Sequence, residues 1–301
     1  MKHRETGSYK FLSSFGLYGL FNPVETCGFG TASPFVPVFL YGVRMPTFCR
    51  LPVLVSVLML MLTAFQTRPA VADAVSSLFQ GSGVKPDKVV ESLAETFDHV
   101  VFGAEIDPNL RQSVVARWQG PIGIALQGRV SERHAAFLQA HLRELSKLTG
   151  LRFTQVKPDD PGQKITFAFV KRAEMTSINI PGVDPALVRR LGQGGGCYFL
   201  SFKKPASRIV FAIVVVNVER DMAHLNSCLL EEAAQSLGLP NDQDILRPSI
   251  FSDRDRVTEL APVDIALIRA LYDSRMTAGL SRTKALETAR TIFAEMAKKA
   301  R

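Results

Sequence analysis

Apolar residues recur at helical spacing in two stretches of the chain. The first follows Pro86 and places Val89, Val90, Leu93, Phe97 and Val100 along one side of a helix. The second starts after Ser131, a favourable N-cap residue, and stops at Gly150, a residue type that commonly ends helices. Its apolar face consists of Ala135, Leu138, Leu142, Leu145 and Leu148. The pattern predicts two amphipathic helices.

Other stretches have the pattern of β-strands. Residues 121–128 alternate Ile122, Ile124 and Leu126 with other positions, and residues 151–156 form a second short stretch directly after Gly150. Residues 164–170 carry Ile165, Phe167 and Phe169 on one face. The run over 208–218 is the most hydrophobic, which predicts a strand in the interior of a sheet.

The remaining segments complete the pattern of an α+β protein. We expect a long loop over 171–197, which contains the sequence GQGGGC, and a helix over about 226–238 that ends at Gly238 and Pro240. Two further helices should start at Pro262 and after Ser281. Strand, helix, several strands and then helices predict an α+β domain, with helices packed on a mixed sheet and a helical C-terminal part.

The N-terminal region has the features of an export signal. Arg44 and Arg50 precede an uncharged apolar run over 51–65, and Ala70-Val71-Ala72 follows. A basic region, an apolar region and an A-x-A site in this order are typical of a secretory signal peptide. The apolar run is shorter than the about 20 residues that a membrane-spanning helix needs. We therefore expect cleavage after Ala72, a periplasmic or secreted location, and no stable membrane span after cleavage.

These features divide the chain into four parts. Residues 1–44 are rich in Phe, Gly and Pro without a helical or strand period, and we interpret them as a wrongly assigned start upstream of Met45 or as a disordered leader. Residues 45–72 form the predicted signal peptide. Residues 73–105 contain a lead-in and the N-terminal helix, and residues 106–301 form one predicted domain.

The charge balance gives little support to nucleic-acid binding. The formal charge is +8, but removing residues 1–72, with six basic and two acidic residues, leaves 30 − 26, or +4. No run of Lys and Arg interleaved with aromatic residues is present in the sequence. We expect no nucleic-acid partner.

Two cysteines lie in the predicted mature chain, Cys197 and Cys228. A pair of cysteines in an exported protein usually forms a disulfide, because the compartment is oxidising. The alternative is two buried free thiols. A disulfide would connect the glycine-rich segment to the helix expected at 226–238.

The segment CLLEEAAQSLGLPND, residues 228–242, has a spacing suited to a metal site. Glu231 and Gln235 are four positions apart and share one helix face, and a turn at Gly238 would bring Asn241 back toward them. The segment resembles the metzincin zinc-protease pattern H-E-x-x-H-x-x-G-x-x-H without a gap. The resemblance places Glu231, Gln235 and Asn241 at the ligand positions and Glu232 at the position of the catalytic Glu.

The resemblance to metzincins covers roughly 118–273. A hydrophobic strand precedes the helix, LAPVDIALIRALYD is similar to the helix that follows the active site, and Phe251 of SIFS takes the place of the methionine in the methionine turn. The chain resembles an uncharacterised family of exported bacterial proteins more closely. That similarity lies in RW..PI, in the cysteine before LLEE, in LGLPND and in SIFSD...TEL.

The chemistry of the ligand positions argues against zinc proteolysis. Glu231, Gln235 and Asn241 offer oxygen atoms, whereas protease zinc sites use imidazole ligands. Without a metal-bound water Glu232 has no activated nucleophile to deprotonate. We therefore expect no zinc and no other cofactor, and hydrogen bonds from the two amides to Glu231 in place of the metal. The resemblance implies an exported, catalytically inactive metzincin-like domain that binds a peptide or protein partner.

Three alternatives remain open. The chain could be a hydrolase that uses Glu231 or Glu232 as acid or base, or a structural envelope protein. The segment could also be an ordinary amphipathic helix with solvated Glu and Gln and an apolar face of Leu229, Leu230, Ala233, Ala234 and Leu237. The following loop is acidic and could hold Ca²⁺, but it lacks EF-hand spacing; its acids are Asp242, Asp244, Asp253, Asp255 and Glu259.

Overall fold

The structure is a computed structural model, and it describes residues 71–80, 83–104, 111–204 and 207–300. The predicted leader over 1–44 and almost all of the predicted signal peptide over 45–72 lie outside these residues. The first described helix, α2 (Val71–Gln80), includes the predicted cleavage site between Ala72 and Asp73, and its Val75 is buried in the core.

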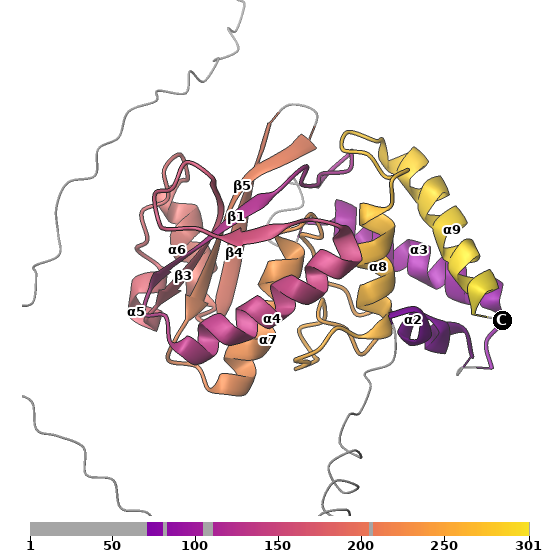
Figure 1. Cartoon of the computed structure of the whole chain (residues 1–301), viewed down its shortest axis with the longest axis horizontal. Coiled ribbons are helices and arrows are strands. Elements are labelled where there is room, and N and C mark those ends of the chain that lie inside the picture. The colour runs from indigo at the N-terminus through magenta and orange to yellow at the C-terminus, as the bar shows by residue number, and fades with distance from the viewer. Residues whose placement is uncertain (1–70, 81–82, 105–110, 205–206, 301) are drawn as a thin grey trace, which may run out of the picture. The chain divides into compact units, whose positions relative to one another are not determined.

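A five-stranded mixed sheet forms the centre of the fold, in the order β2-β1-β3-β5-β4 (Figure 1). Its strands are β1 (Ile122–Gly128), β2 (Phe153–Gln155), β3 (Gln163–Val170), β4 (Cys197–Lys204) and β5 (Arg208–Asn217). The β1–β2, β1–β3 and β3–β5 pairs are parallel, and β4 runs antiparallel to β5 at the edge. The hydrophobic strand β5 lies inside the sheet, as its composition predicts.

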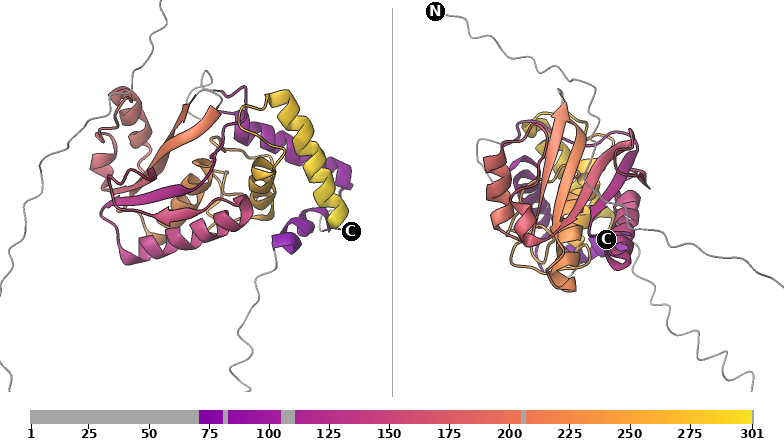
Figure 2. Two further views of the ribbon diagram at one scale, coloured as in Figure 1. Left: turned by 45° about the horizontal axis from the view of Figure 1, so that its top comes forward. Right: turned by 90° about the vertical axis from the view of Figure 1, so that its left-hand side faces the viewer.

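Strand alternation gives the sheet two apolar faces, and helices lie over both of them (Figure 2). Ile165, Phe167 and Phe169 of β3 point to the larger core cluster, which also contains Leu138 of α4 (Glu132–Thr149) and Leu229 of α7 (Met222–Gln235). The opposite face carries a smaller cluster beneath α5 (Arg172–Met175) and α6 (Pro185–Gln193); it consists of Ala168, Met175, Ile180, Val188, Tyr198, Ile213 and Val215. Both faces are covered because the parallel strands are apolar on both sides.

The prediction of a long loop over 171–197 is wrong in part, because α5 and α6 form within this segment and β4 starts at its end. Two local signals for α6 are present: Asp184 caps the helix by accepting from Ala186 N, and Pro185 occupies the first turn. Val188 packs on the sheet face below. This packing stabilises α6, because a helix of nine residues is not stable by itself.

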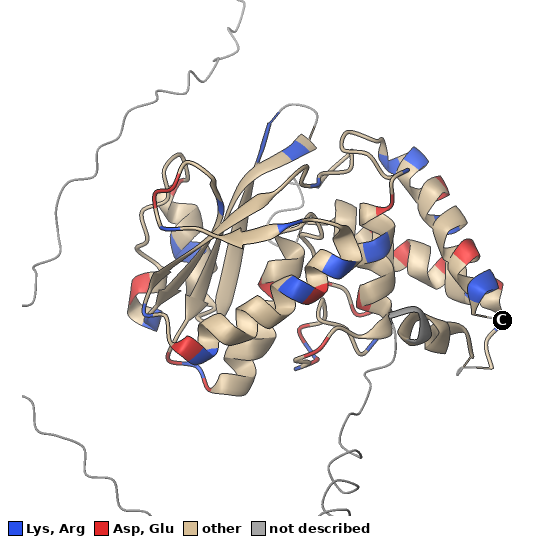
Figure 3. Ribbon diagram, viewed as in Figure 1, with Lys and Arg blue, Asp and Glu red and all other residues tan. Residues whose placement is uncertain are grey.

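The C-terminal part is helical, as predicted. Helices α8 (Pro262–Tyr272) and α9 (Arg282–Lys299) pack with α2 and α3 (Pro86–Phe102), and Phe97 of α3 meets Phe293 of α9 edge to face with ring centroids 6.2 Å apart. Basic and acidic residues are interspersed along α3 and α9 (Figure 3). Among them, Arg282 pairs with Asp98, and Arg290 pairs with Glu91 at 3.0 Å.

The predicted fold class is confirmed: the described residues form an α+β arrangement with a mixed sheet and a helical C-terminal part. Residues of α3 such as Leu93 and Phe97 belong to the same core cluster as the sheet. None of the described helices is both long enough and apolar enough to cross a membrane.

Candidate functional site

Helix α7 follows strand β5 almost directly and carries the Glu231–Gln235 segment. It starts at Met222, earlier than predicted, because the Asp221 carboxylate caps it by accepting from the N–H groups of Ala223 and His224, both at 3.1 Å. Cys228 therefore lies in the middle of the helix. The predicted disulfide is confirmed: Cys228 is bonded to Cys197 at the start of β4, with 6.0 Å between the Cα atoms.

The polar residues of α7 are not on a solvated face. Glu232 is only 5% exposed and Gln235 only 3%, while Glu231 is half-buried. The alternative of an ordinary amphipathic helix predicted solvated Glu and Gln side chains, and this is wrong for Glu232 and Gln235. Its predicted apolar face is buried in the core; this face consists of Leu229, Leu230, Ala233, Ala234 and Leu237. Burial of a carboxyl and an amide on the same helix requires polar surroundings.

The chain turns at Gly238, as the spacing predicts. Gly238 has φ of +115°, and a Cβ atom at this position would lie 2.2 Å from the carbonyl oxygen of Ala116. Only glycine fits this conformation and this close approach. Two side chains hold the end of the helix: Trp118 Nε1 donates to Ser236 O at 2.9 Å, and the Tyr272 hydroxyl donates to Leu237 O at 2.8 Å.

The turn brings a carboxylate back to α7, but it belongs to Asp242. Glu231, Asp242 and Asp253 each place a ligand atom within 4.8 Å of the others, and Gln235 Nε2 donates to Asp242 Oδ1 at 2.6 Å. We call Glu231, Asp242 and Asp253 the acidic cluster. Its oxygen donors match the preferences of Ca²⁺ or Mg²⁺ better than those of zinc. The repulsion among close carboxylates is relieved by a cation or by a retained proton.

Asn241, the expected third ligand position, directs its amide elsewhere. Its Nδ2 donates to His99 O at 3.1 Å and to Asp242 O at 2.9 Å, so both of its amide hydrogens are used by backbone carbonyls. The predicted hydrogen bond from Asn241 to Glu231 is thus replaced by contacts to the end of α3, and the Gln235 amide bonds Asp242. The sequence pattern did not predict that Asp242 and Asp253 lie next to Glu231. The sequence feature that could have indicated this contact is the acidic composition of the loop after the helix.

Phe251 lies in a tight turn of the loop between α7 and α8 and is fully buried. Ser252 N donates to Ser249 O at 3.3 Å across the turn, and Phe251 N donates to Ser249 Oγ at 3.0 Å. The turn is tied to α8 through Asp264, which accepts from Ser249 Oγ at 2.7 Å, Ile250 N at 3.1 Å and Ala261 N at 2.7 Å. Burial raises the pKa of Asp264 to about 7, because desolvation outweighs these three hydrogen bonds.

Two of the pockets in the described part of the chain are lined by neither Glu231 nor Glu232. One lies between the 117–121 segment, the end of α4 and the loop after α8. The other lies between α4, β1 and the short strand β2.

The outer edge of β4 faces no other strand of the described sheet. Asn217 N donates to Gly196 O at 3.0 Å, and the register continues with Tyr198 opposite Val215. Alternate residues of an antiparallel pair turn their N–H groups away from the partner strand. The backbone N–H groups of Phe199 and Ser201 consequently point outward along this edge, while the disulfide fixes the start of the strand to α7.

Comparison with known proteins identifies the family and gives no activity. No curated protein matches the chain. The predicted similarity to an uncharacterised family is supported, because the model of a family described as "Protein of unknown function (DUF2927)" matches residues 90–291. This match covers α4, α7, α8 and the whole sheet. Since it spans well over half of the chain, the protein belongs to this family of unknown function, DUF2927.

Proposed function

We propose that the protein is an exported, metzincin-like domain that does not act as a zinc protease and instead binds an extended peptide or protein segment. The observation that supports the proposal is the geometry around α7 together with the donors that meet there. Helix α7 follows β5, Gly238 turns the chain, and the disulfide ties β4 to α7. Among the described residues, the side chains that meet there are three carboxylates and an amide.

The donor set supports the absence of zinc chemistry. A catalytic zinc site uses protein ligands that leave one position open for water, and histidine is the usual ligand. At this site Asn241 bonds backbone carbonyls, and Gln235 bonds Asp242. A carboxylate cluster of this kind suits a hard cation, which would strengthen the loop after α7 without providing a zinc-bound hydroxide.

The edge of β4 supports binding of an extended segment. Outward N–H and C=O groups on an unpaired edge pair readily with another strand, and main-chain hydrogen bonds then provide affinity with little dependence on sequence. The strand is eight residues long, which suffices for several such bonds. Its position is fixed at one end by the bond from Cys197 to Cys228.

Export is part of the proposal. The basic, apolar and A-x-A segments precede α2, and the disulfide pair requires an oxidising compartment to persist. N-terminal sequencing of the protein recovered from the periplasm or the medium should begin at Asp73. A cytoplasmic protein with Met1 or Met45 intact would contradict this part.

Binding to an unfolded polypeptide tests the edge-strand proposal. We expect β-casein, an extended probe, to bind the wild-type protein in a surface-based binding assay and to remain uncleaved. Ser201→Pro removes an outward N–H without removing a β5 hydrogen bond, so binding should fall about tenfold or more. Ser201→Ala retains the N–H and should bind as the wild type does.

Three outcomes would overturn parts of the proposal. Equal binding by Ser201→Pro and Ser201→Ala would show that the β4 edge is not the site. No binding at all would remove the peptide-binding function. Cleavage of β-casein by the wild type and not by Glu232→Gln would establish the hydrolase alternative.

A further inference from the structure

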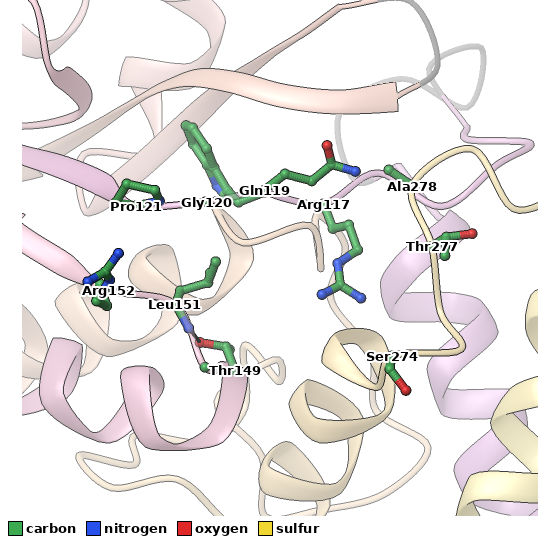
Figure 4. Close-up of a pocket in the computed structure, with 12 residues that line it drawn as sticks. Arg117, Gln119, Gly120, Pro121, Thr149, Leu151, Arg152, Ser274, Thr277 and Ala278 are labelled. Atoms are coloured by element: carbon green, nitrogen blue, oxygen red, sulfur yellow. Dashed lines mark hydrogen bonds between the residues drawn. The ribbon is translucent and has the colours of Figure 1, made fainter.

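A second site lies away from the acidic cluster, in the pocket beside Arg117. The pocket has a volume of about 490 Å³, within the range of small-molecule sites. Its wall is built from three segments distant in sequence, namely 117–121, 149–152 and 274–278. In Figure 4 the Arg117 side chain reaches toward Ser274, and Arg152 lies at the other end of the pocket beside Pro121.

Arg117 is held in place by one of its three guanidinium nitrogens. Nη1 donates to Leu271 O at 2.9 Å, Asp273 O at 3.1 Å and Met276 O at 2.5 Å, and the guanidinium lies 4.4 Å from the centre of the Tyr272 ring. These contacts cap the C-terminal end of α8. Within the described residues, Nη2 and Nε of Arg117 donate to no protein acceptor, so two further donor groups of a rigid fork remain available.

The pocket contains positive charge without a matching carboxylate. Among the described residues that line it, only Arg117 and Arg152 carry a charge, and none is Asp or Glu. The nearby carboxylate of Asp273 accepts from Arg275 Nε at 2.8 Å and from Arg275 Nη2 at 2.9 Å. Burial lowers the pKa of Arg117, and the attraction of Tyr272 and Asp273 only partly opposes that effect. A half-buried cation in this situation is stabilised by an anion.

We propose that this pocket binds a small molecule carrying an oxyanion group, a carboxylate or a phosphate. The anion accepts hydrogen bonds from the free side of the Arg117 fork, which suits the planar geometry of such groups. Ser274 and Thr277 line the pocket on the side of the loop after α8. Arg152, which is exposed and forms no ion pair with a described residue, attracts the ligand to the pocket and contacts a second polar group.

A purely structural role for Arg117 explains the three bonds from Nη1 but not the rest of the pocket. Capping α8 requires carbonyl contacts, which Nη1 provides alone. It does not require Arg152 at the other end of the pocket. The segment RW..PI, one of the stretches that resembles the uncharacterised family, supplies Arg117, Trp118 and Pro121 to the pocket.

The pocket contains its own spectroscopic reporter. Trp118 is the single tryptophan of the chain and lines the pocket. We would titrate potassium phosphate and potassium citrate separately into the purified protein, with ionic strength held constant by potassium chloride, and follow tryptophan emission. We expect a saturable change with at least one of the two anions. Saturation with phosphate alone identifies a phosphate-bearing ligand, and saturation with citrate alone identifies a carboxylate.

Matched arginine variants separate a specific site from general attraction. Arg152→Gln should weaken binding about threefold or more, because an exposed charge contributes modestly. Arg143→Gln removes the same charge from an exposed position on α4 that lines the other pocket, and it should leave the dissociation constant unchanged. Arg117→Lys keeps the charge but loses the fork, so a folded variant should lose binding about tenfold.

The proposal is overturned if neither anion produces a saturable change at millimolar concentrations. It is also overturned if Arg143→Gln and Arg152→Gln weaken binding equally, because the anion would then respond to overall charge. Should Arg117→Lys fail to fold, the comparison of the two glutamine variants still decides the question, since both positions are exposed and outside the helix-capping contacts.

Discussion

Gln235 Nε2 donates to Asp242 Oδ1 at 2.6 Å, across the turn at Gly238. The residue that returns to α7 is therefore Asp242, one position beyond the third ligand position of the metzincin pattern. Asn241 is held by the carbonyl groups of His99 and Asp242 instead.

This geometry predicts which histidine substitutions create a zinc site. The triple variant Glu231→His, Gln235→His and Asp242→His should bind one zinc ion, because residues 231 and 235 share a helix face and residue 242 meets them. The matched variant with Asn241→His in place of Asp242→His should bind zinc at least about tenfold more weakly. Competition with a chromogenic chelator measures both affinities. Tighter binding by the Asn241→His variant would contradict the arrangement.

The disulfide is expected to contribute strongly to stability. It closes a loop with a sequence separation of 31 residues, and the loop-entropy model gives about 3 to 4 kcal/mol for that length. The double variant Cys197→Ser and Cys228→Ser should lose about this much free energy of unfolding in urea titrations. Dithiothreitol should lower the midpoint of the wild type and leave that of the double variant unchanged. An unchanged wild-type midpoint would show that the bond is absent or without effect.

The Tyr272 hydroxyl connects three parts of the fold. It donates to Leu237 O at 2.8 Å and accepts from Trp118 N at 3.3 Å, both in buried surroundings. Tyr272→Phe leaves both backbone groups without this partner, so the free energy of unfolding should fall by about 1 to 3 kcal/mol. Thr291→Val, which removes an exposed hydroxyl from α9, should change it by less than about 0.5 kcal/mol. Equal effects would show that the buried hydroxyl is not stabilising.

Asp264 should make stability depend on pH. Its pKa rises from 3.8 to about 7 in the folded protein, so between these values the folded state holds a proton that the unfolded chain releases. Its contribution to stability is fully present below about pH 4 and is lost as the pH rises to about 7. Urea unfolding at pH 5 and pH 8 should therefore show a larger loss for the wild type than for Asp264→Asn, at about 1 kcal/mol per pH unit over the titrating range.

Other groups titrate in the same range, so the comparison with Asp264→Asn is essential. Burial lowers the pKa of His134, which has the opposite effect: stability is lost as the pH falls below the ordinary histidine value of 6.5. Because both proteins contain His134, its contribution cancels in the difference. Identical pH profiles for the two proteins would show that Asp264 is ionised throughout.

Several features followed from the sequence alone because their causes are local. The Ser131 cap, the Gly150 stop and the periodic leucines define α4, and alternation defines β1 and β3. The turn at Gly238 follows from a backbone conformation that only glycine adopts without strain. The pairing of Cys197 with Cys228 follows from their being the two cysteines of the predicted mature chain.

The tertiary structure decided the features that depend on residues distant in sequence. Asp253 reaches Glu231 only because the loop after α7 folds back, and no spacing rule marks that contact. Helix α6 is short and forms on the sheet face that buries Val188. The sequence of α7 has an amphipathic pattern, yet Glu232 and Gln235 are buried. The reason is that the 241–253 loop and the neighbouring helices determine which face of α7 is exposed. Local periodicity specifies an element, whereas packing among elements specifies which of its polar groups meet.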